Sequence, residues 1–152
     1  MIGRIIKNPE VANNIDILIK SISNPFDENK HGLEVLLKTQ FHHYIDFPSL
    51  SLIIPIVEYG LKSRESVLKE KAAQLIGAIT ILINDVKFIL PYVESLTNSL
   101  KIAICDPISD VRNISAKALG SLANKIGEAN SEKIIMVLKG FYKIYFIFLR
   151  IF

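Results

Sequence analysis

Three stretches of this 152-residue chain can be aligned with one another without gaps. The stretch from Asp106 to Gly120 matches the stretch from Ser63 to Gly77, and both match the stretch that begins at Asn24. The matches recur at a period of about 40 residues, and each period contains two amphipathic segments with apolar residues three and four apart. The chain therefore repeats one structural unit of two helices.

Units of this length and type are typical of HEAT and armadillo repeats. A single unit cannot bury its apolar face, so it stacks on its neighbours and builds an extended surface. The sequence therefore predicts an all-α fold, a right-handed HEAT or armadillo superhelix (α-α solenoid) whose surface binds partners. We expect whole repeats over residues 8–45, 49–83 and 87–127, and a partial repeat over residues 129–139.

Turn-forming residues and prolines mark the ends of the expected helices. In the first repeat we expect helices over residues 8–23 and 27–45, and in the third over residues 87–105 and 109–126. We predict Ser49 as an N-cap and Gly127 as a C-cap. Pro55 and Pro91 are each expected to bend the first helix of a repeat, because proline removes one backbone hydrogen bond.

Small residues occupy matching places in the second and third repeats. They are Ala73 and Gly77, with Ala116, Ala118 and Gly120. We expect them to let helices of adjacent repeats approach closely.

Residues 140–152 differ from the rest of the chain, because they are almost wholly apolar and aromatic without a polar stripe. They are too few for a membrane span, which needs about 20 residues. We expect this tail to be foreign to the solenoid, such as read-through past an exon boundary. The alternative is a second helix of the last repeat. Because the partial repeat leaves apolar surface exposed, weak self-association is also expected.

The bulk composition limits the classes of function. The formal net charge is +3, and two of the basic residues, Lys143 and Arg150, lie in the tail, so nothing demands a nucleic-acid-binding face. The single cysteine excludes an internal disulfide and a cysteine-based zinc site. We expect Cys105 to be a buried small hydrophobe. The first residues do not resemble a secretion signal, and a cytoplasmic location is expected.

No candidate active site emerges from the sequence. His42 and His43 are adjacent and diverge by about 100° on a helix, whereas metal ligands on one helix need spacings of three or four. His31 does not complete a convincing set. There is no Gly-x-Ser-x-Gly turn and no glycine-rich phosphate loop. We therefore predict a protein that is not an enzyme and has no metal and no cofactor.

One set of polar residues recurs at the turn inside each repeat. In the third repeat it is Asp106 with Arg112. The matching pairs in the earlier repeats are Asn24 with Lys30 and Ser63 with Lys69. We expect a structural ladder in which the turn oxygen of one repeat accepts a hydrogen bond from a cation of the next repeat. The alternative is a role in partner recognition.

The densest basic cluster contains Lys62, Arg64, Lys69 and Lys71, with Glu65 and Glu70 interleaved. A solvated helix face is the default interpretation of such a mixture. The alternative is contact with ribosomal RNA or with an acidic protein. We take these four residues and Lys117 as the candidate partner surface.

Two long runs resemble one family closely. They extend from Leu36 to Phe41 and from Ile45 to Val57, and they are similar to the middle region of the general-control translational activator, the activator of the eIF2-alpha kinase. Further matching runs are Lys71 to Gly77, Leu90-Pro91-Tyr92, Asp106-Pro107, Val111-Arg112, Ser115 to Leu122 and Gly127-Glu128. The resemblance covers about residues 3–138 and is specific to the elongation-factor-three-like HEAT segment of that activator. A weaker resemblance to fungal elongation factor three itself accompanies it.

The resemblance implies a function that the repeats alone do not. Members of the family are ribosome-associated scaffolds that promote kinase activation in amino-acid starvation, and this segment is associated with an ABC-type ATPase partner. The expected function is therefore a non-catalytic scaffold. Its expected partners are proteins and the ribosome, and no membrane contact is expected. The alternatives are a transport-receptor or phosphatase-scaffold type of HEAT array and a direct RNA-binding module.

Overall fold

A computed structural model describes residues 5–132, 134–136 and 138–140 of the chain. The expectation for the tail, residues 140–152, lies outside the described residues except for Gly140. Within the described part no helix is long and apolar enough to cross a membrane.

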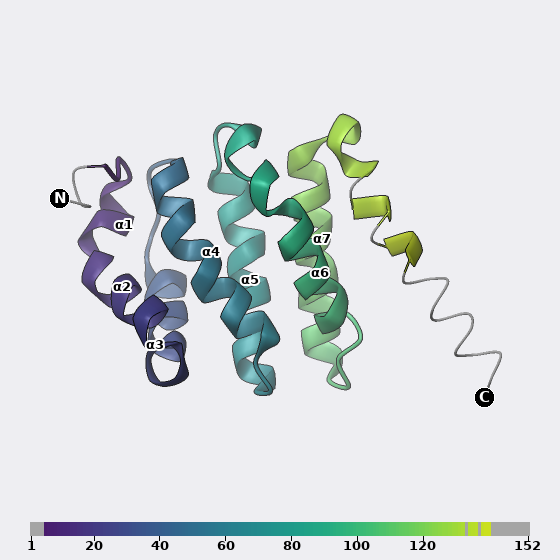
Figure 1. Cartoon of the computed structure of the whole chain (residues 1–152), viewed down its shortest axis with the longest axis horizontal. Coiled ribbons are helices and arrows are strands. Elements are labelled where there is room, and N and C mark those ends of the chain that lie inside the picture. The colour runs from purple at the N-terminus through teal and green to yellow at the C-terminus, as the bar shows by residue number, and fades with distance from the viewer. Residues whose placement is uncertain (1–4, 133, 137, 141–152) are drawn as a thin grey trace.

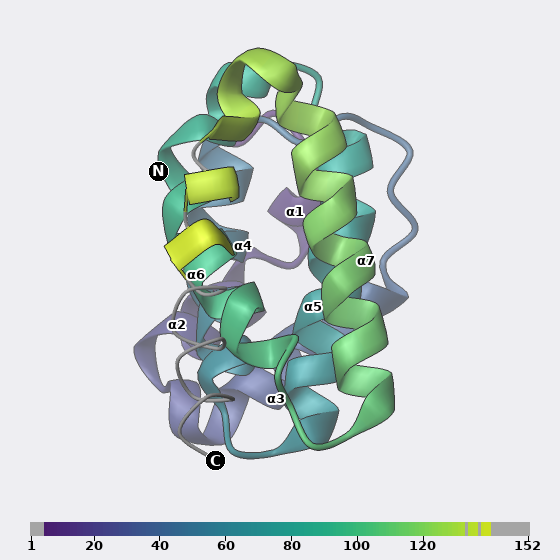
Figure 2. The same cartoon turned by 90° about the vertical axis from the view of Figure 1, so that its right-hand side faces the viewer.

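Helices follow one another along an axis in two layers (Figures 1 and 2). The first layer contains α1 (Pro9–Asn13) and α2 (Ile15–Ser23), then α4 (Phe47–Lys62), then the 3-10 turns η2 (Val86–Phe88) and η3 (Leu90–Tyr92) with α6 (Val93–Ala103). The second layer contains α3 (Pro25–Lys38), α5 (Ser66–Leu82) and α7 (Ser109–Ile126). In the first layer, α2, α4 and α6 each pack on the second-layer helix that follows, and α4 also packs on α2 and α6. The predicted all-α solenoid is confirmed.

The core runs without interruption through all the helix pairs. In α4, for example, Leu50, Ile53 and Val57 are fully buried, at the spacing of one helix face. Ile134, beyond α7, is also buried, and residues 128–132 are helical, so the core continues past the end of α7. The apolar period read from the sequence is thus the physical basis of the stacking.

The first repeat ends differently from the expectation, because α3 stops at Lys38 and residues 39–46 are extended or looped. The loop is held by two neighbours. The N–H of Ile45 donates to the carbonyl of Leu82 at 2.9 Å, in an isolated parallel bridge between Ile45 and Ile83. The side-chain amide of Asn8 donates to the carbonyls of His43 and Tyr44, both at 3.2 Å. These bonds replace those of the missing helical turns.

The N-cap of α4 is Asp46, so the prediction for Ser49 is wrong. Ser49 is fully buried inside the first turn, and its hydroxyl donates to Asp46 Oδ1. The same carboxylate accepts the backbone N–H groups of Lys7 at 3.1 Å and Asn8 at 3.4 Å. Asp46 therefore ties the segment before α1 to the start of the second repeat.

The first-layer helices of the first and third repeats are interrupted. The expected helix over residues 8–23 is divided at Asn14, whose side-chain amide donates to the Glu10 carbonyl at 2.8 Å. In place of the first part of the expected helix over residues 87–105 there are two 3-10 turns. The regular helix begins only at Val93, two residues after Pro91. Pro55, by contrast, lies inside an uninterrupted α4.

The glycines do not all serve close packing. A Cβ at Gly60 would lie 2.8 Å from Leu33 Cδ1 and 3.0 Å from Ala72 Cβ, so this glycine is required by its neighbours. A Cβ at Gly77 or Gly120 would meet nothing within 4 Å, which contradicts the expected close approach at these positions. Gly127 ends α7 at φ 72°, as predicted for a C-cap.

Cys105 is exposed, so the expectation of a buried side chain is wrong. It lies in the turn after α6, where Leu100 and Ala103 take the inward positions of the last helical turn. Ala116 is likewise exposed, whereas Ala73 and Ala118 are buried.

Candidate partner-binding surfaces

An ion pair joins the second repeat to the third at their turns. Lys69 Nζ lies 2.5 Å from Asp106 Oδ2, and the two side chains are 19% and 3% exposed. Asp106 Oδ1 also accepts the backbone N–H of Ile108 at 3.0 Å. The hydrogen bond from Lys69, followed by that from Ile108, lowers the pKa of Asp106 below its ordinary value of 3.8. The turn carboxylate is therefore ionised and fixed.

The hydrogen bonds given for Arg112 and Asn24, two other residues of the predicted ladder, stay within their own repeats. Arg112 donates to the carbonyls of Asp106 at 2.9 Å and Pro107 at 2.8 Å, so it braces its own turn. Asn24 donates to Asp27 at 2.8 Å, and Lys30 is exposed. In the Lys69–Asp106 pair the cation comes from the earlier repeat, which is the reverse of the expected direction.

Two further polar contacts cross between repeats. Lys71 Nζ of α5 lies 2.5 Å from Glu34 Oε1 of α3, and this hydrogen bond lowers the pKa of Glu34. The Ser95 hydroxyl of α6 donates to Glu58 of α4. Each layer of the solenoid therefore carries its own polar tie.

The residues of the predicted basic cluster differ in their surroundings. Lys69 and Lys71 are the two lysines engaged in the ion pairs. Lys62 stands at the end of α4 and Arg64 is exposed in the following turn, whereas Lys117 is exposed on α7. Of the five residues of the candidate surface, two are thus engaged in ion pairs, two lie at the turn between α4 and α5, and one lies on α7.

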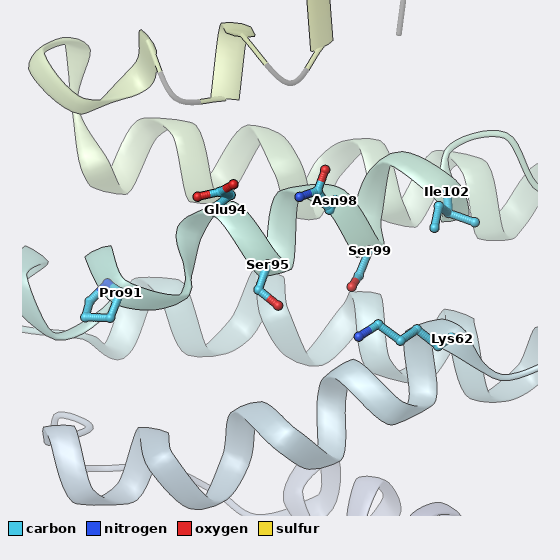
Figure 3. A pocket seen from close by; sticks show the side chains of 7 residues that line it. All are labelled: Lys62, Pro91, Glu94, Ser95, Asn98, Ser99 and Ile102. Carbon is cyan, nitrogen blue, oxygen red and sulfur yellow. The ribbon is translucent and has the colours of Figure 1, made fainter. Parts of the chain in front are cut away.

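A hollow of about 440 Å³ lies between α4 and α6 (Figure 3). Lys62 reaches from α4 toward Ser99 of α6, while Glu94 and Asn98 point from the side of α6 that is farther from α4 (Figure 3). Its lining residues are Lys62, Pro91, Glu94, Ser95, Asn98, Ser99 and Ile102. Most residues of this hollow are of polar type but contribute much apolar surface, and exposed Ile102 lies at one end.

Two more hollows, of about 370 and 450 Å³, lie between α5 and α7 and share Ser121. We call them together the α5/α7 trough. Its lining residues are Glu70, Ala73, Gln74, Gly77, Thr80 and Ile81 of α5, with Ile114, Lys117, Ala118, Ser121, Asn124 and Lys125 of α7. Sequence reasoning missed Ile81 and Lys125. It noted Ala73 and Gly77 but interpreted them as helix contacts.

The histidines take part in local structure rather than gathering at one point. His43 Nδ1 lies 2.7 Å from Glu10 Oε1, which also accepts the His42 backbone N–H at 3.3 Å. Burial acts to raise the pKa of Glu10, but these hydrogen bonds outweigh it and lower that pKa. His31 and His42 are exposed. Within the described residues, no three His, Cys, Asp or Glu side chains gather as a metal site.

The stacked two-helix units and the polar ties between them define a HEAT-type solenoid. A profile described as "Elongation factor 3/GNC1 HEAT repeat" matches residues 28–133. The chain belongs to this elongation factor 3/GNC1 HEAT-repeat family.

Named relatives agree with this assignment. The eIF-2-alpha kinase activator GCN1 of Saccharomyces cerevisiae is 39% identical over 126 residues, which cover 83% of this chain and 5% of the yeast protein. The stalled ribosome sensor GCN1 of Homo sapiens is 39% identical over 134 residues, covering 88% of this chain and 5% of the human protein. Elongation factor 3B of Saccharomyces cerevisiae is more distant, with 29% identity over 86% of this chain and 12% of the factor. The chain thus spans about one twentieth of the length of its GCN1 relatives.

Proposed function

We propose that this chain is a non-catalytic HEAT-repeat scaffold segment of a ribosome-associated translational activator, one that promotes activation of the eIF2-alpha kinase in amino-acid starvation. The observation that carries the proposal is the 39% identity to GCN1 proteins over more than four fifths of the chain. The more distant match to elongation factor 3B supports a position in the elongation-factor-like part of such an activator. The relationship favours this function over a transport-receptor or phosphatase-scaffold type of HEAT array.

The physical structure supports a scaffold. A continuous core and polar ties between repeats keep the helix pairs in fixed order, so side chains on different repeats hold fixed relative positions. The hollows between α4 and α6 and between α5 and α7 are open surface features that suit protein segments. The proposed partners are the ribosome, an ABC-type ATPase and other proteins, in the cytoplasm.

In this proposal, only a few residues are available to contact ribosomal RNA. Lys62, Arg64 and Lys117 are the members of the candidate surface that are exposed and outside the ion pairs. Because only these three cations are exposed and outside the ion pairs, we expect few phosphate contacts and a shallow dependence of ribosome association on salt.

The test replaces the matching segment of yeast eIF-2-alpha kinase activator GCN1 with the described repeats of this chain. The matched control carries a HEAT array of equal length from a transport receptor. We expect the first chimera to co-sediment with ribosomes and to support eIF2-alpha phosphorylation in amino-acid starvation, and the control to fail in at least one assay. If both chimeras work equally well, or if the first is expressed and fails in both assays, the proposal is wrong.

A further inference from the structure

The two seams of the second layer differ in how they are filled. Between α3 and α5, the side chains of Glu34 and Lys71 meet across the seam at 2.5 Å. Between α5 and α7, the α5/α7 trough stays open. This difference needs an explanation, because α5 is common to both seams.

The repeat alignment locates the cause in a few side chains. Glu34 of the first repeat corresponds to Ala73 of the second, and Lys38 corresponds to Gly77. Lys71 in turn corresponds to Ile114 of the third repeat. The residues that would bridge the second seam are therefore replaced by small ones and by an apolar one. Since a Cβ at Gly77 would meet nothing within 4 Å, packing inside the chain does not require this glycine.

The walls of the trough carry charge of mostly one sign. Lys117 and Lys125 line it from α7, and after Asp110 in its first turn α7 contains no acidic residue. Neither lysine makes an ion pair with any residue that the structure describes. Glu70, from α5, is the one acidic lining residue at the Lys117 end.

The floor and one rim of the trough are apolar. Ala73, Gly77 and Ala118 form its floor, and Ile81 stands at the Lys125 end with 73% of its surface exposed. A smooth floor of small residues lets a second helix approach closely, and an exposed isoleucine on its rim supplies apolar contact. The trough combines these features with two lysines that form no ion pair with the described residues.

We propose that the α5/α7 trough binds an amphipathic α-helix of a partner protein, with the apolar side of that helix on the floor and acidic side chains toward Lys117 and Lys125. Lys125 follows Lys117 by eight positions, which correspond to a rise of about 12 Å along α7. The bound helix therefore presents its two acidic groups about two turns apart. The inference names the class of segment that a scaffold would hold, so it rests on the function proposed above.

A protein helix fits the trough better than a nucleic acid strand. Phosphate binding needs an array of cations, whereas here Glu70 lies close to Lys117 among the lining residues and Ile81 accompanies Lys125. Carboxylates on an otherwise apolar helix match both the charge and the apolar floor.

The test measures binding of a fluorescent helical peptide to the full 152-residue chain. The alanine-based peptide carries a leucine between two glutamates placed about two turns apart on one face. Gly77→Leu fills the floor at a position where the fold has room. Gly120→Leu is the matched control, because it is also a roomy helical glycine and does not line the trough.

We expect saturable binding to the unmodified chain, weakened at least about tenfold by Gly77→Leu and unchanged by Gly120→Leu. The double substitution Lys117→Glu with Lys125→Glu should reject this peptide and bind the version with lysines in place of the glutamates. Absence of binding, equal loss in both glycine variants, or indifference to the charge exchange overturns the proposal. Displacement of the peptide by a single-stranded RNA at equal phosphate and peptide concentration also overturns it, in favour of phosphate binding.

The assay is independent of ribosomes and of the kinase. Failure of peptide binding with intact function of the GCN1 chimera would remove the trough and leave the scaffold in place. Peptide binding together with failure of the chimera would keep the trough as a helix-binding site and reject the proposed function in translation.

Discussion

The seam between α3 and α5 and the seam between α5 and α7 belong to the same layer. An ion pair spans the first, which we call the closed seam, whereas the α5/α7 trough follows the second, which we call the open seam. At the closed seam, Glu34 and Lys71 pair, and the loop at residues 39–46 bonds to the end of α5 through Ile45. At the open seam, the ion pair lies at the turn, where Lys69 meets Asp106, and the α5/α7 trough runs along the surface over the two packed helices. The comparison teaches that a repeat array can hold its order with ties at the edge while leaving surface free between helices.

The interior beside the closed seam should be the most sensitive part of the molecule. Leu33 of α3 is fully buried, so Leu33→Ala should lower the free energy of unfolding by about 2–5 kcal/mol through lost burial and a residual cavity. Ile81→Ala, at the open seam, should change it by no more than about 0.5 kcal/mol, because that side chain is mostly in solvent. Urea denaturation of the two variants measures the contrast. Equal losses would mean that the trough is closed in solution.

Two glycines on neighbouring elements should respond in opposite directions to the same substitution. Gly60→Ala forces a methyl group against Leu33 and Ala72, and the crowding should outweigh the gain in helix propensity, for a net loss of about 1 kcal/mol. Gly77→Ala meets nothing within 4 Å and should gain about 0.5–1 kcal/mol. Thermal unfolding of both variants tests this. A stabilising Gly60→Ala would show that α3, α4 and α5 are packed less closely than described.

The fold could be predicted from the sequence because its cause is periodic. Apolar residues three and four apart recur with the period of the repeat, and the buried positions of α4 and α5 follow them. The local departures have causes that no period reveals. The loop at residues 39–46 depends on the side-chain amide of Asn8, and the late start of α6 depends on Pro91.

The candidate surfaces were less accessible to sequence reasoning. The alignment identified Lys69 and Asp106 but not which repeat supplies the cation, because that direction depends on the offset between neighbouring turns. Small residues at Ala73 and Gly77 are compatible with both close packing and an open trough, since both leave a helix without bulk. Comparing these positions with Glu34 and Lys38 in the first repeat is the signal that separates the two interpretations.

The ion pairs at the two seams should give the smallest effects, visible through their dependence on pH. The pKa values of Asp106 and Glu34 are lowered in the folded chain, first by the hydrogen bonds from Lys69 and Lys71 respectively. Their contribution to stability is therefore complete above the ordinary pKa values of 3.8 and 4.5, and it is lost as the pH falls through the lowered folded-state values.

Thermal unfolding of the unmodified chain, Asp106→Asn and Glu34→Gln between pH 7 and pH 2 tests this expectation. The unmodified chain should unfold at a higher temperature than either variant at pH 7, and this stability difference should disappear in acid. It should be larger over Asp106→Asn, because the Asp106 side chain is 3% exposed and that of Glu34 is 32% exposed and more screened by water. A stability difference that stays constant down to pH 2 would mean that the two side chains act through their shape rather than their charge. A larger effect of Glu34→Gln would place the stronger tie at the closed seam and reverse the comparison between the two.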